Sequence, residues 1–383
     1  MKKYLLIAFL FSTTVVFPQT GVTYSKTFTI GGVSRSFTYY VPAIYDGTTP
    51  VPLIINVHGW TGSSSKQESY ADFRKIADTA NFIVIHPQAL GSPPSWATND
   101  TYGPTATDKV YIMACMDTIE AHYNINTDRE YSTGFSQGGL TTYDMACFYS
   151  DRFAAIASVA GGLSNTHANI CAPHHPIPVM EVHGTQDRLA TYTGSGVSLA
   201  IDSVIKFWVH FNGCNPIPVT ADTLPDISTT DSCKVVHFVY TGGAQGSTVE
   251  LYKVLNGDHQ WPSEVTTTNV YGLGNRNMDF TASKEIWRFF SQYSKMVGIE
   301  EQVANSGGVV IYPNPSTGIF HIEFKNNQNA TITVVNVLGE TVLEKKISGS
   351  TETLDLNAAP AGVYFYQVAN QSGIITSGKL IVE

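Results

Sequence analysis

Charged residues, and basic ones in particular, are scarce in this chain. They make up 14% of its 383 residues, against about 25% in an average globular protein. The 22 Lys and Arg are outnumbered by 31 Asp and Glu, which gives a net charge of −9. Nucleic-acid binders need a basic surface, so this balance argues against such a partner. Apolar residues reach 43%, too many for a disordered chain and enough for a large core.

Motifs for common cofactors are also absent. No Gly-x-Gly-x-x-Gly or Walker sequence opens a helical stretch, and the chain has no His-Glu-x-x-His and no Cys-x-x-Cys. The adjacent His174 and His175 are better explained by a solvated loop, because neighbouring side chains diverge. We therefore expect no metal and no nucleotide or other cofactor.

The first residues have the pattern of an export signal. Lys2 and Lys3 precede a mostly apolar stretch that is too short to span a bilayer comfortably. We expect a signal peptide over 1–19, cleaved near Gln19 or Thr20, and the alternative is a buried first strand or helix. No later stretch has the pattern of a transmembrane helix. The mature protein is thus predicted to be soluble, secreted and extracellular or at the cell surface.

Export permits disulfides, and the chain has five cysteines, an odd number. Cys115 lies in an apolar helical stretch and is expected to be a buried free thiol. The short separations predict the pairs Cys147–Cys171 and Cys214–Cys233.

Strand and helix patterns alternate over most of the chain, which predicts an α/β domain over 20–297. Two antiparallel strands are expected over 22–41, joined at a Gly-Gly turn. Continuous apolar runs then indicate strands buried on both faces, and helical stretches separate them, so we expect a mostly parallel, doubly wound sheet. These strands are expected at 51–57, 82–85, 131–135, 154–159, 179–182 and 249–254, and the helices at 67–80, 107–123, 138–148, 197–211 and 281–294.

The pattern stops near residue 297. A polar, Gly-ended linker is expected over 298–307. From 308 to 383 the chain has only short β-type runs between turn residues, which predicts a small all-β sandwich domain.

A Gly-x-Ser-x-Gly sequence at 134–138 provides a candidate nucleophile, Ser136. A β-type run precedes it and a helical stretch follows, as in the strand-to-helix turn that presents a serine hydroxyl. The glycines fit this turn, because a neighbouring Cβ would clash there. The alternative is an ordinary Gly-rich turn.

A serine nucleophile needs a base, and the base needs an acid to orient it. His259 follows the last strand of the large domain, where a late base is expected, and Asp187 follows the strand at 179–182. We predict these two as base and acid. The alternative acid is Asp258, but it adjoins His259, and adjacent side chains rarely meet in this geometry.

Two backbone N–H groups are candidates for an oxyanion hole. One is that of Gln137, the residue after the nucleophile, and the other is that of Trp60, in the loop after the first buried strand. His58, Trp96 and Trp261 are candidates for the substrate pocket, with packing as the alternative role for each.

Together these motifs resemble the polyhydroxybutyrate depolymerase-like and carbohydrate esterase family 1 branch of the α/β hydrolases, which includes feruloyl and acetylxylan esterases. The resemblance covers about 22–295, and the chain departs from it in having Trp60 where many relatives have cysteine and Asp258-His259-Gln260 where many have Gly-His-Thr. The family implies an α/β-hydrolase fold and the same triad and oxyanion positions. The segments that carry the resemblance are SRSFTYYVP, VPLIINVHGW, FIVIHPQ, YNINTDREYSTGFSQGG, DRFAAIASVAGG, PIPVMEVHGTQD and NGDHQWP.

The tail resembles the C-terminal sorting domain of the type IX secretion system. The matching segments are YPNPSTG at 312–318, NVLG at 336–339, AGVY at 361–364 and the ending GKLIVE. This implies that the secretion machinery recognises residues 308–383.

The leading hypothesis is a secreted serine esterase that acts on feruloyl or acetyl esters of plant polysaccharide. The alternatives are a polyester depolymerase of the polyhydroxybutyrate type and a non-catalytic binding protein on a hydrolase scaffold. Expected partners are the ester-bearing polysaccharide, oligosaccharide or polyester and the secretion machinery, with no nucleic acid.

Overall fold

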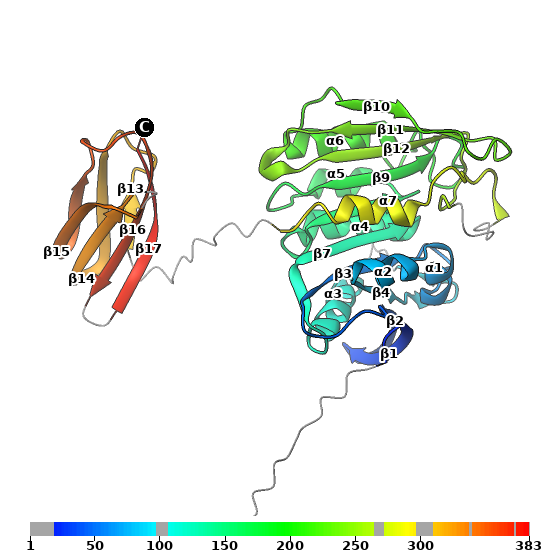
Figure 1. The fold of residues 1–383 in the computed structure, drawn as a ribbon, viewed down its shortest axis with the longest axis horizontal. Coiled ribbons are helices and arrows are strands. Elements are labelled where there is room, and N and C mark those ends of the chain that lie inside the picture. Colours follow the sequence, from blue (N-terminus) through cyan, green and yellow to red (C-terminus); the bar gives the residue numbers. More distant parts are fainter. Residues whose placement is uncertain are drawn as a thin grey trace, which may run out of the picture. The chain divides into compact units, whose positions relative to one another are not determined.

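The computed structural model describes residues 19–96, 106–263, 272–295, 309–336, 339–370 and 373–382. The chain divides into two compact units, Met1–Met296 and Val297–Glu383 (Figure 1). The expected signal peptide, apart from Gln19, and the expected linker lie outside the described residues.

The described part of the first unit is built on a 10-stranded sheet. Its six central strands run parallel, and antiparallel strands flank them at both edges. This confirms the expected α/β class. In spatial order the strands are β1 (Val22–Ile30), β2 (Val33–Val41), β4 (Ile83–Pro87), β3 (Val51–Val57), β7 (Ile125–Phe135), β8 (Ala155–Val159), β9 (Val179–Gly184), β12 (Val249–Leu255), β11 (Lys234–Tyr240) and β10 (Thr220–Thr223).

Helices cover both faces of this sheet, as the continuous apolar strands require. Leu53 and Ile55 of β3 pack into one core, and Ile54 between them packs into the other, because successive side chains of a strand point to opposite faces. One core contains α3 (Ala106–Glu120), α4 (Gln137–Phe148), α5 (Asn165–Ile170) and α6 (Ile201–Asn212), and the other contains α1 (Ser64–Tyr70), α2 (Arg74–Ala80) and α7 (Ala282–Phe290) (Figure 1).

The helix expected over 67–80 is two short helices, α1 and α2. The break lies at 71–73, where the Asp72 carboxylate accepts a hydrogen bond from the backbone N–H of Arg74 at 2.9 Å. Such a local side-chain-to-backbone bond competes with a continuous helix. Smaller elements are the hairpin β5 (Leu90–Gly91) and β6 (Pro94–Ser95) and the 3₁₀ turns Ser150–Arg152 and Ala244–Gly246. None of the helices in the described residues has the length and apolar character needed to cross a bilayer.

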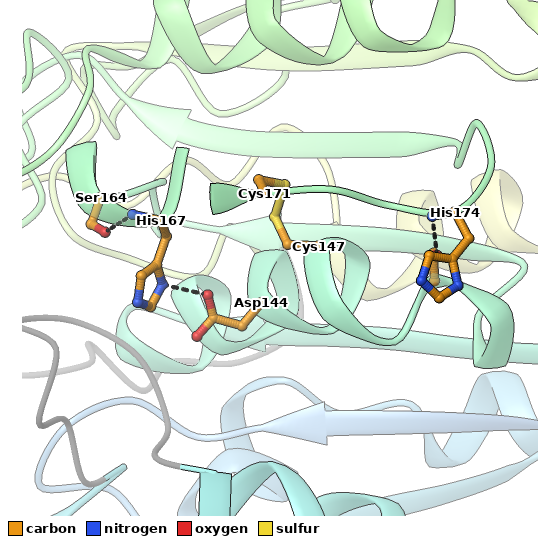
Figure 2. Close-up of a disulfide and its surroundings, with 7 residues drawn as sticks. Asp144, Cys147, Ser164, His167, Cys171 and His174 are labelled. Carbon is orange, nitrogen blue, oxygen red and sulfur yellow. Dashed lines mark hydrogen bonds and ion pairs between the residues drawn. A yellow bond between two sulfur atoms is a disulfide. The ribbon is translucent and has the colours of Figure 1, made fainter. Parts of the chain in front are cut away.

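One of the two expected disulfides is present. Cys147, near the end of α4, is bonded to Cys171, which follows α5 (Figure 2). The prediction of a Cys214–Cys233 bridge is wrong, and both residues are buried free thiols, as is Cys115.

The structure explains why that second bridge cannot form. Cys214 packs into the core on one face of the sheet and Cys233 into the core on the other. They also lie at opposite ends of β11, because Cys233 directly precedes this strand, whereas Asn215 N–H bonds to the carbonyl of Thr241 just beyond it. Seven residues of strand span on the order of 20 Å, so the short separation in sequence is not a short distance in space.

The second unit is an antiparallel all-β domain, as expected. Its strands are β13 (Val309–Tyr312), β14 (Ile319–Val335), β15 (Thr341–Asp355), β16 (Gly362–Asn370) and β17 (Gly373–Val382). The first half of β14 pairs with β13 and the second half with β16, and a register shift between Glu323 and Gln328 separates the two halves. Phe320, Ile332 and Leu380 belong to the single apolar core that this unit contains among its described residues.

Candidate active site

Ser136 lies at a sharp turn between β7 and α4. Its backbone has φ 58° and ψ −120°, a strained conformation for a residue other than glycine. Its N–H donates to the carbonyl of Val159 at the end of β8, at 2.9 Å. The turn therefore places Ser136 at the carboxyl edge of the parallel strands, the edge at which ligands bind in open α/β sheets.

The flanking glycines allow this turn to pack against β3. A Cβ atom at Gly138 would lie 2.0 Å from the carbonyl oxygen of Val57, and one at Gly134 would lie 2.4 Å from that of Gly138. No side chain fits at either position without moving the backbone of its neighbours. The Gly-x-Ser-x-Gly sequence is thus explained by close packing between β3, β7 and α4.

Asp187 and His259 come from the loops that follow β9 and β12, which pair in parallel. The Nδ1 atom of His259 lies 2.7 Å from Oδ2 of Asp187, and neither side chain is exposed. The second carboxylate oxygen, Oδ1, accepts hydrogen bonds from the N–H groups of Leu189 and Ala190 at 2.9 and 2.8 Å. The carboxylate is thereby fixed on both oxygens.

Asp258, the alternative acid, has a different set of partners. Its Oδ2 accepts from Nε of Arg188 at 2.6 Å, and its Oδ1 accepts from the backbone N–H of His259 at 2.7 Å. Although burial opposes ionisation, the hydrogen bonds from Arg188 and from the His259 backbone lower the pKa of Asp258. Its carboxylate holds the loop that carries His259, whereas Asp187 contacts the His259 ring.

The two residues expected at the oxyanion hole line one cavity together with Ser136. Gln137 is the first residue of α4, so its N–H lies at the helix N-terminus, where donors are not used within the helix. Its side-chain Oε1 accepts from the backbone N–H of Trp96 at 3.1 Å, which ties the first turn of α4 to the segment after β6. Trp60 follows β3 and is 56% exposed.

The expectation that His58, Trp96 and Trp261 form the substrate pocket is corrected by their positions. All three are buried, and none lines the cavity at Ser136. The Nε2 atom of His58 accepts from the N–H of Ala89 at 3.0 Å, and burial lowers the pKa of His58 to about 4. Trp96 donates from Nε1 to the His58 carbonyl at 2.7 Å, and Trp261 packs among three aromatic rings. They support the site from within the core.

The cavity has a volume of about 400 Å³, and His259 also lines it. Much of its wall comes from the segment 189–201, which the sequence did not mark as functional. The backbone N–H of Leu199 bonds to the carbonyl of Leu163 at 3.0 Å, and Ser198 forms a β-bridge with Ser164. The wall is thus anchored on the strand-to-helix connection between β8 and α5. The residues that it contributes are Leu189, Ala190, Thr191, Ser195, Val197, Ser198, Leu199 and Ile201.

The sequence signal for this wall was weak. Small and polar residues over 193–198 have no helix or strand periodicity, and the helix expected from 197 begins only at Ile201. The exposed apolar residues Leu189 and Val197 are the features that could have drawn attention to it. Among the described residues, no group of three His, Cys, Asp or Glu side chains is placed to hold a metal ion.

The sheet order, the strained turn and the Asp187–His259 pair at one sheet edge define an α/β-hydrolase fold. An acetyl xylan esterase from Aspergillus awamori has the same fold, with a TM-score of 0.50 and 14% identity over 70% of this chain and 99% of that one.

Sequence comparisons agree with the resemblance to esterases. The chain is 24% identical over 291 residues to a bifunctional acetylxylan esterase/xylanase of Neocallimastix patriciarum, which covers 75% of this chain and 37% of that protein. It is 28% identical over 241 residues to a probable feruloyl esterase C of Aspergillus niger. That match covers 59% of this chain and 82% of the relative. The chain spans about a third to a half of the length of the first curated relatives that it matches.

The tail matches a separate family. Residues 310–383 match the family described as "Secretion system C-terminal sorting domain". This agrees with the sorting domain expected from the sequence, and it places the protein outside the cell or at the cell surface.

Proposed function

We propose that the first unit is a serine carboxylic-ester hydrolase. Ser136 is the nucleophile, His259 the general base and Asp187 the acid that orients it. The backbone N–H groups of Gln137 and Trp60 form the oxyanion hole. The observation that supports this most directly is the 2.7 Å Asp187–His259 pair beside a cavity that Ser136, at its strained turn, also lines.

The proposed reaction has two steps. The Asp187 carboxylate accepts a hydrogen bond from Nδ1–H of His259, so that the unprotonated Nε2 takes the proton of the Ser136 hydroxyl as its oxygen attacks the ester carbonyl. The oxyanion that forms is stabilised by the two N–H donors. His259 then gives its proton to the departing alcohol, which leaves an acyl group on Ser136. In the second step a water molecule, activated by His259, attacks the acyl group on Ser136 and releases the free carboxylic acid.

We further propose feruloyl or acetyl esters on plant polysaccharide as substrates, as the names of the relatives suggest. The size of the cavity favours an ester with at least one large group, because sites of roughly 300–1,000 Å³ hold molecules much larger than acetate. The exposed Trp60, Leu189 and Val197 provide apolar surface for such a group. Of the two acyl groups, feruloyl fits this wall better.

For the second unit we propose recognition by the type IX secretion machinery through residues 308–383. The supporting observation is the match to a sorting domain over nearly all of this range.

The test of the proposed hydrolase is a substrate panel combined with covalent labelling. Methyl ferulate, p-nitrophenyl acetate, acetylated xylan and polyhydroxybutyrate film should be compared at equal enzyme concentration. We expect turnover of the soluble esters, with methyl ferulate favoured, and labelling by a fluorophosphonate at Ser136. Labelling at another serine would contradict the assignment of the nucleophile, and release of hydroxybutyrate faster than ferulate would favour the polyester alternative.

A further inference from the structure

A chain of buried polar side chains continues behind Asp187 into the core. Glu181 and His183 are two residues apart on β9, so both point to the same face of the sheet. The Oε1 atom of Glu181 lies 2.7 Å from Nδ1 of His183, and Nε2 of His183 lies 3.4 Å from Oδ2 of Asp187. None of these three side chains is exposed. On α4, Tyr143 donates its hydroxyl proton to Oε2 of Glu181 at 2.7 Å.

The hydrogen bonds determine where the protons of His183 lie. Its Nε2 atom is 2.7 Å from the carbonyl oxygen of Ala190, which can only accept, so Nε2 must carry a proton. The hydroxyl of Tyr143 keeps its proton, because burial and the charge of Glu181 raise the pKa of Tyr143 well above its ordinary value. That proton satisfies one oxygen of Glu181, and the 2.7 Å hydrogen bond between its other oxygen and Nδ1 of His183 holds one further proton, which the raised pKa of His183 places on Nδ1.

Both nitrogens of His183 therefore donate, and the ring is an imidazolium. Burial alone would favour the neutral ring, but the hydrogen bond to Glu181 and its charge outweigh burial and raise the pKa of His183. The other ring packed against it belongs to Tyr192, at 5.9 Å between centroids, and its hydroxyl bonds instead to Asp202. The positive charge of His183 thus faces the two carboxylates of Glu181 and Asp187.

We propose that His183, paired with Glu181, is a positioning residue for Asp187: a buried imidazolium that keeps this carboxylate ionised and aimed at His259. The inference rests on the proposed esterase function. His183 lies beside the same Oδ2 atom that binds His259, and it also holds the carbonyl of Ala190. Because the N–H of Ala190 binds the other oxygen of Asp187, His183 restrains the acid through both its charge and its loop.

The consequence for catalysis follows from charge balance. When His259 takes the proton of Ser136, a positive charge develops beside Asp187, and an Asp187 carboxylate that stayed ionised and immobile stabilises it without rearrangement. Without the imidazolium, two carboxylates would share the buried site with no cation while His259 is neutral, and one of them would tend to take up a proton. A protonated or displaced Asp187 would no longer hold the Nδ1 proton of His259.

The first test is spectroscopic and needs no turnover. Imidazole ¹⁵N NMR of the histidine-labelled full chain at about pH 8, above the ordinary histidine pKa of about 6.5, should show a doubly protonated ring that disappears in His183→Gln and is thereby assigned to His183. In Glu181→Gln the amide can donate to Nδ1, so the same ring should become neutral while the packing is kept. A His183 ring with one protonated nitrogen in the wild type would overturn the proposal.

The second test is kinetic, on p-nitrophenyl acetate. Glu181→Gln should lower kcat roughly ten-fold at unchanged KM, well short of the roughly 10⁴-fold loss expected for Asp187→Asn. The matched control is His167→Gln, which removes another buried histidine–carboxylate pair, His167–Asp144 at 2.6 Å (Figure 2), outside this chain of contacts. It should keep the wild-type kcat.

The outcomes separate this inference from the function on which it rests. If the wild-type protein reacts with the fluorophosphonate at Ser136 and Glu181→Gln keeps the wild-type kcat, the positioning role alone would be overturned. A doubly protonated His183 in a protein that hydrolyses none of the esters would support the buried ion pair and contradict the proposed function. If Glu181→Gln does not fold, Tyr143→Phe removes one hydrogen bond to Glu181 and should lower kcat in the same direction, by less, and an unchanged kcat would count against the proposal.

Discussion

The two units bury very different side chains. Among the described residues of the first unit, the buried set includes the ionisable groups Glu130, Glu181, His183, Asp187 and His259. In the described part of the second unit, the buried polar residues are Ser316 and Thr376, neither of which ionises in the ordinary pH range. Burying an ionisable group is unfavourable unless it is paired, so a fold that retains several of them usually does so for chemistry.

The contrast assigns separate tasks to the two units. The first unit has a cavity, a strained serine and paired buried charges, which are the parts of the proposed catalytic site. The second unit has an apolar core within an antiparallel sheet and exposed side chains along its strands. Its function must therefore depend on what its surface presents. The predictions that follow test this division, beginning with the largest expected effect.

The strongest test of the first unit is Ser136→Ala in the full chain. Removing the nucleophile abolishes acyl-enzyme formation and should lower kcat by roughly 10⁴–10⁶. The variant should fold normally, because the substitution removes only an oxygen at a turn that glycines make possible. Steady-state kinetics with p-nitrophenyl acetate measure the fall in kcat, and circular dichroism shows whether the variant is folded. Turnover close to the wild type would remove the catalytic assignment from this unit.

The acid is tested by Asp187→Asn against Asp258→Asn. An amide at 187 can no longer hold the required tautomer of His259, so kcat should fall by up to about 10⁴ with little change in KM. Asp258→Asn breaks the ion pair with Arg188 and should affect stability more than kcat. A larger kcat loss in Asp258→Asn than in Asp187→Asn would reverse the assignment.

Periodicity predicted most of the fold, because strands covered on both faces and helices between them leave clear patterns. It failed where local contacts decide, as at Asp72, which ends α1 and begins α2. Short sequence separation was likewise a poor guide for Cys214 and Cys233, because distance along the sequence says nothing about which face of a sheet each residue reaches.

For the candidate site, chain order and strand ends were enough to predict that Asp187 and His259 lie together, and the structure has His259 Nδ1 at 2.7 Å from Asp187 Oδ2. The pocket was harder to predict. The aromatic residues chosen from the sequence, such as Trp96 and Trp261, are buried, since a large ring serves packing as readily as binding. The actual wall, including Leu189 and Val197, comes from an aperiodic loop whose course only tertiary contacts fix.

A difference in acid stability should also separate the units. Burial lowers the pKa of His86 to about 3 and that of His58 to about 4. In the unfolded chain both would titrate near 6.5, so unfolding takes up protons below that value. The free energy of unfolding of the first unit should be highest above about pH 6.5 and fall as the pH drops toward 4, by about 3 kcal/mol per histidine.

Tryptophan fluorescence during urea unfolding measures this change for the first unit alone, because all five tryptophans precede residue 297. His86→Leu should flatten the slope between pH 6.5 and 4, since neither ring nitrogen of His86 has a hydrogen-bond partner among the described residues. The exposed His210, changed to Gln, is the control and should leave the slope as it is. An unchanged slope in His86→Leu would show that other groups cause the acid sensitivity.

The disulfide should stabilise the first unit without affecting its chemistry. Cys147 and Cys171 close a loop of 24 residues, which corresponds to about 3 kcal/mol in the chain-entropy model. We expect the Cys147→Ala/Cys171→Ala variant to lose this stability and to become insensitive to reductant. Mass mapping of the unreduced protein should find this bridge alone, and a bridge to Cys214 or Cys233 would contradict the structure.

Removing the second unit should have the smallest effect on catalysis. Each apolar core of the first unit consists of residues no later than Tyr293, and the core of the second unit begins at Val309. A chain ending at Met296 should therefore fold and keep its kcat/KM on a soluble ester. In the native host the same truncation should leave the enzyme in the periplasm. Normal secretion of the truncated enzyme would refute the sorting role.

The competing role for the second unit is polysaccharide binding, which the same truncated enzyme tests through its affinity for insoluble xylan. We expect no loss of that affinity. Sugar-binding modules stack aromatic rings on sugars, and the exposed aromatic residues described in this unit, Tyr312 and Phe365, are far apart. They pair with positions of β14 that are fourteen residues apart, His321 and Val335, so the two rings form no continuous platform. Should affinity for xylan fall on truncation while secretion continues, the second unit would be a binding module, and the division between the units would be one of substrate capture and chemistry.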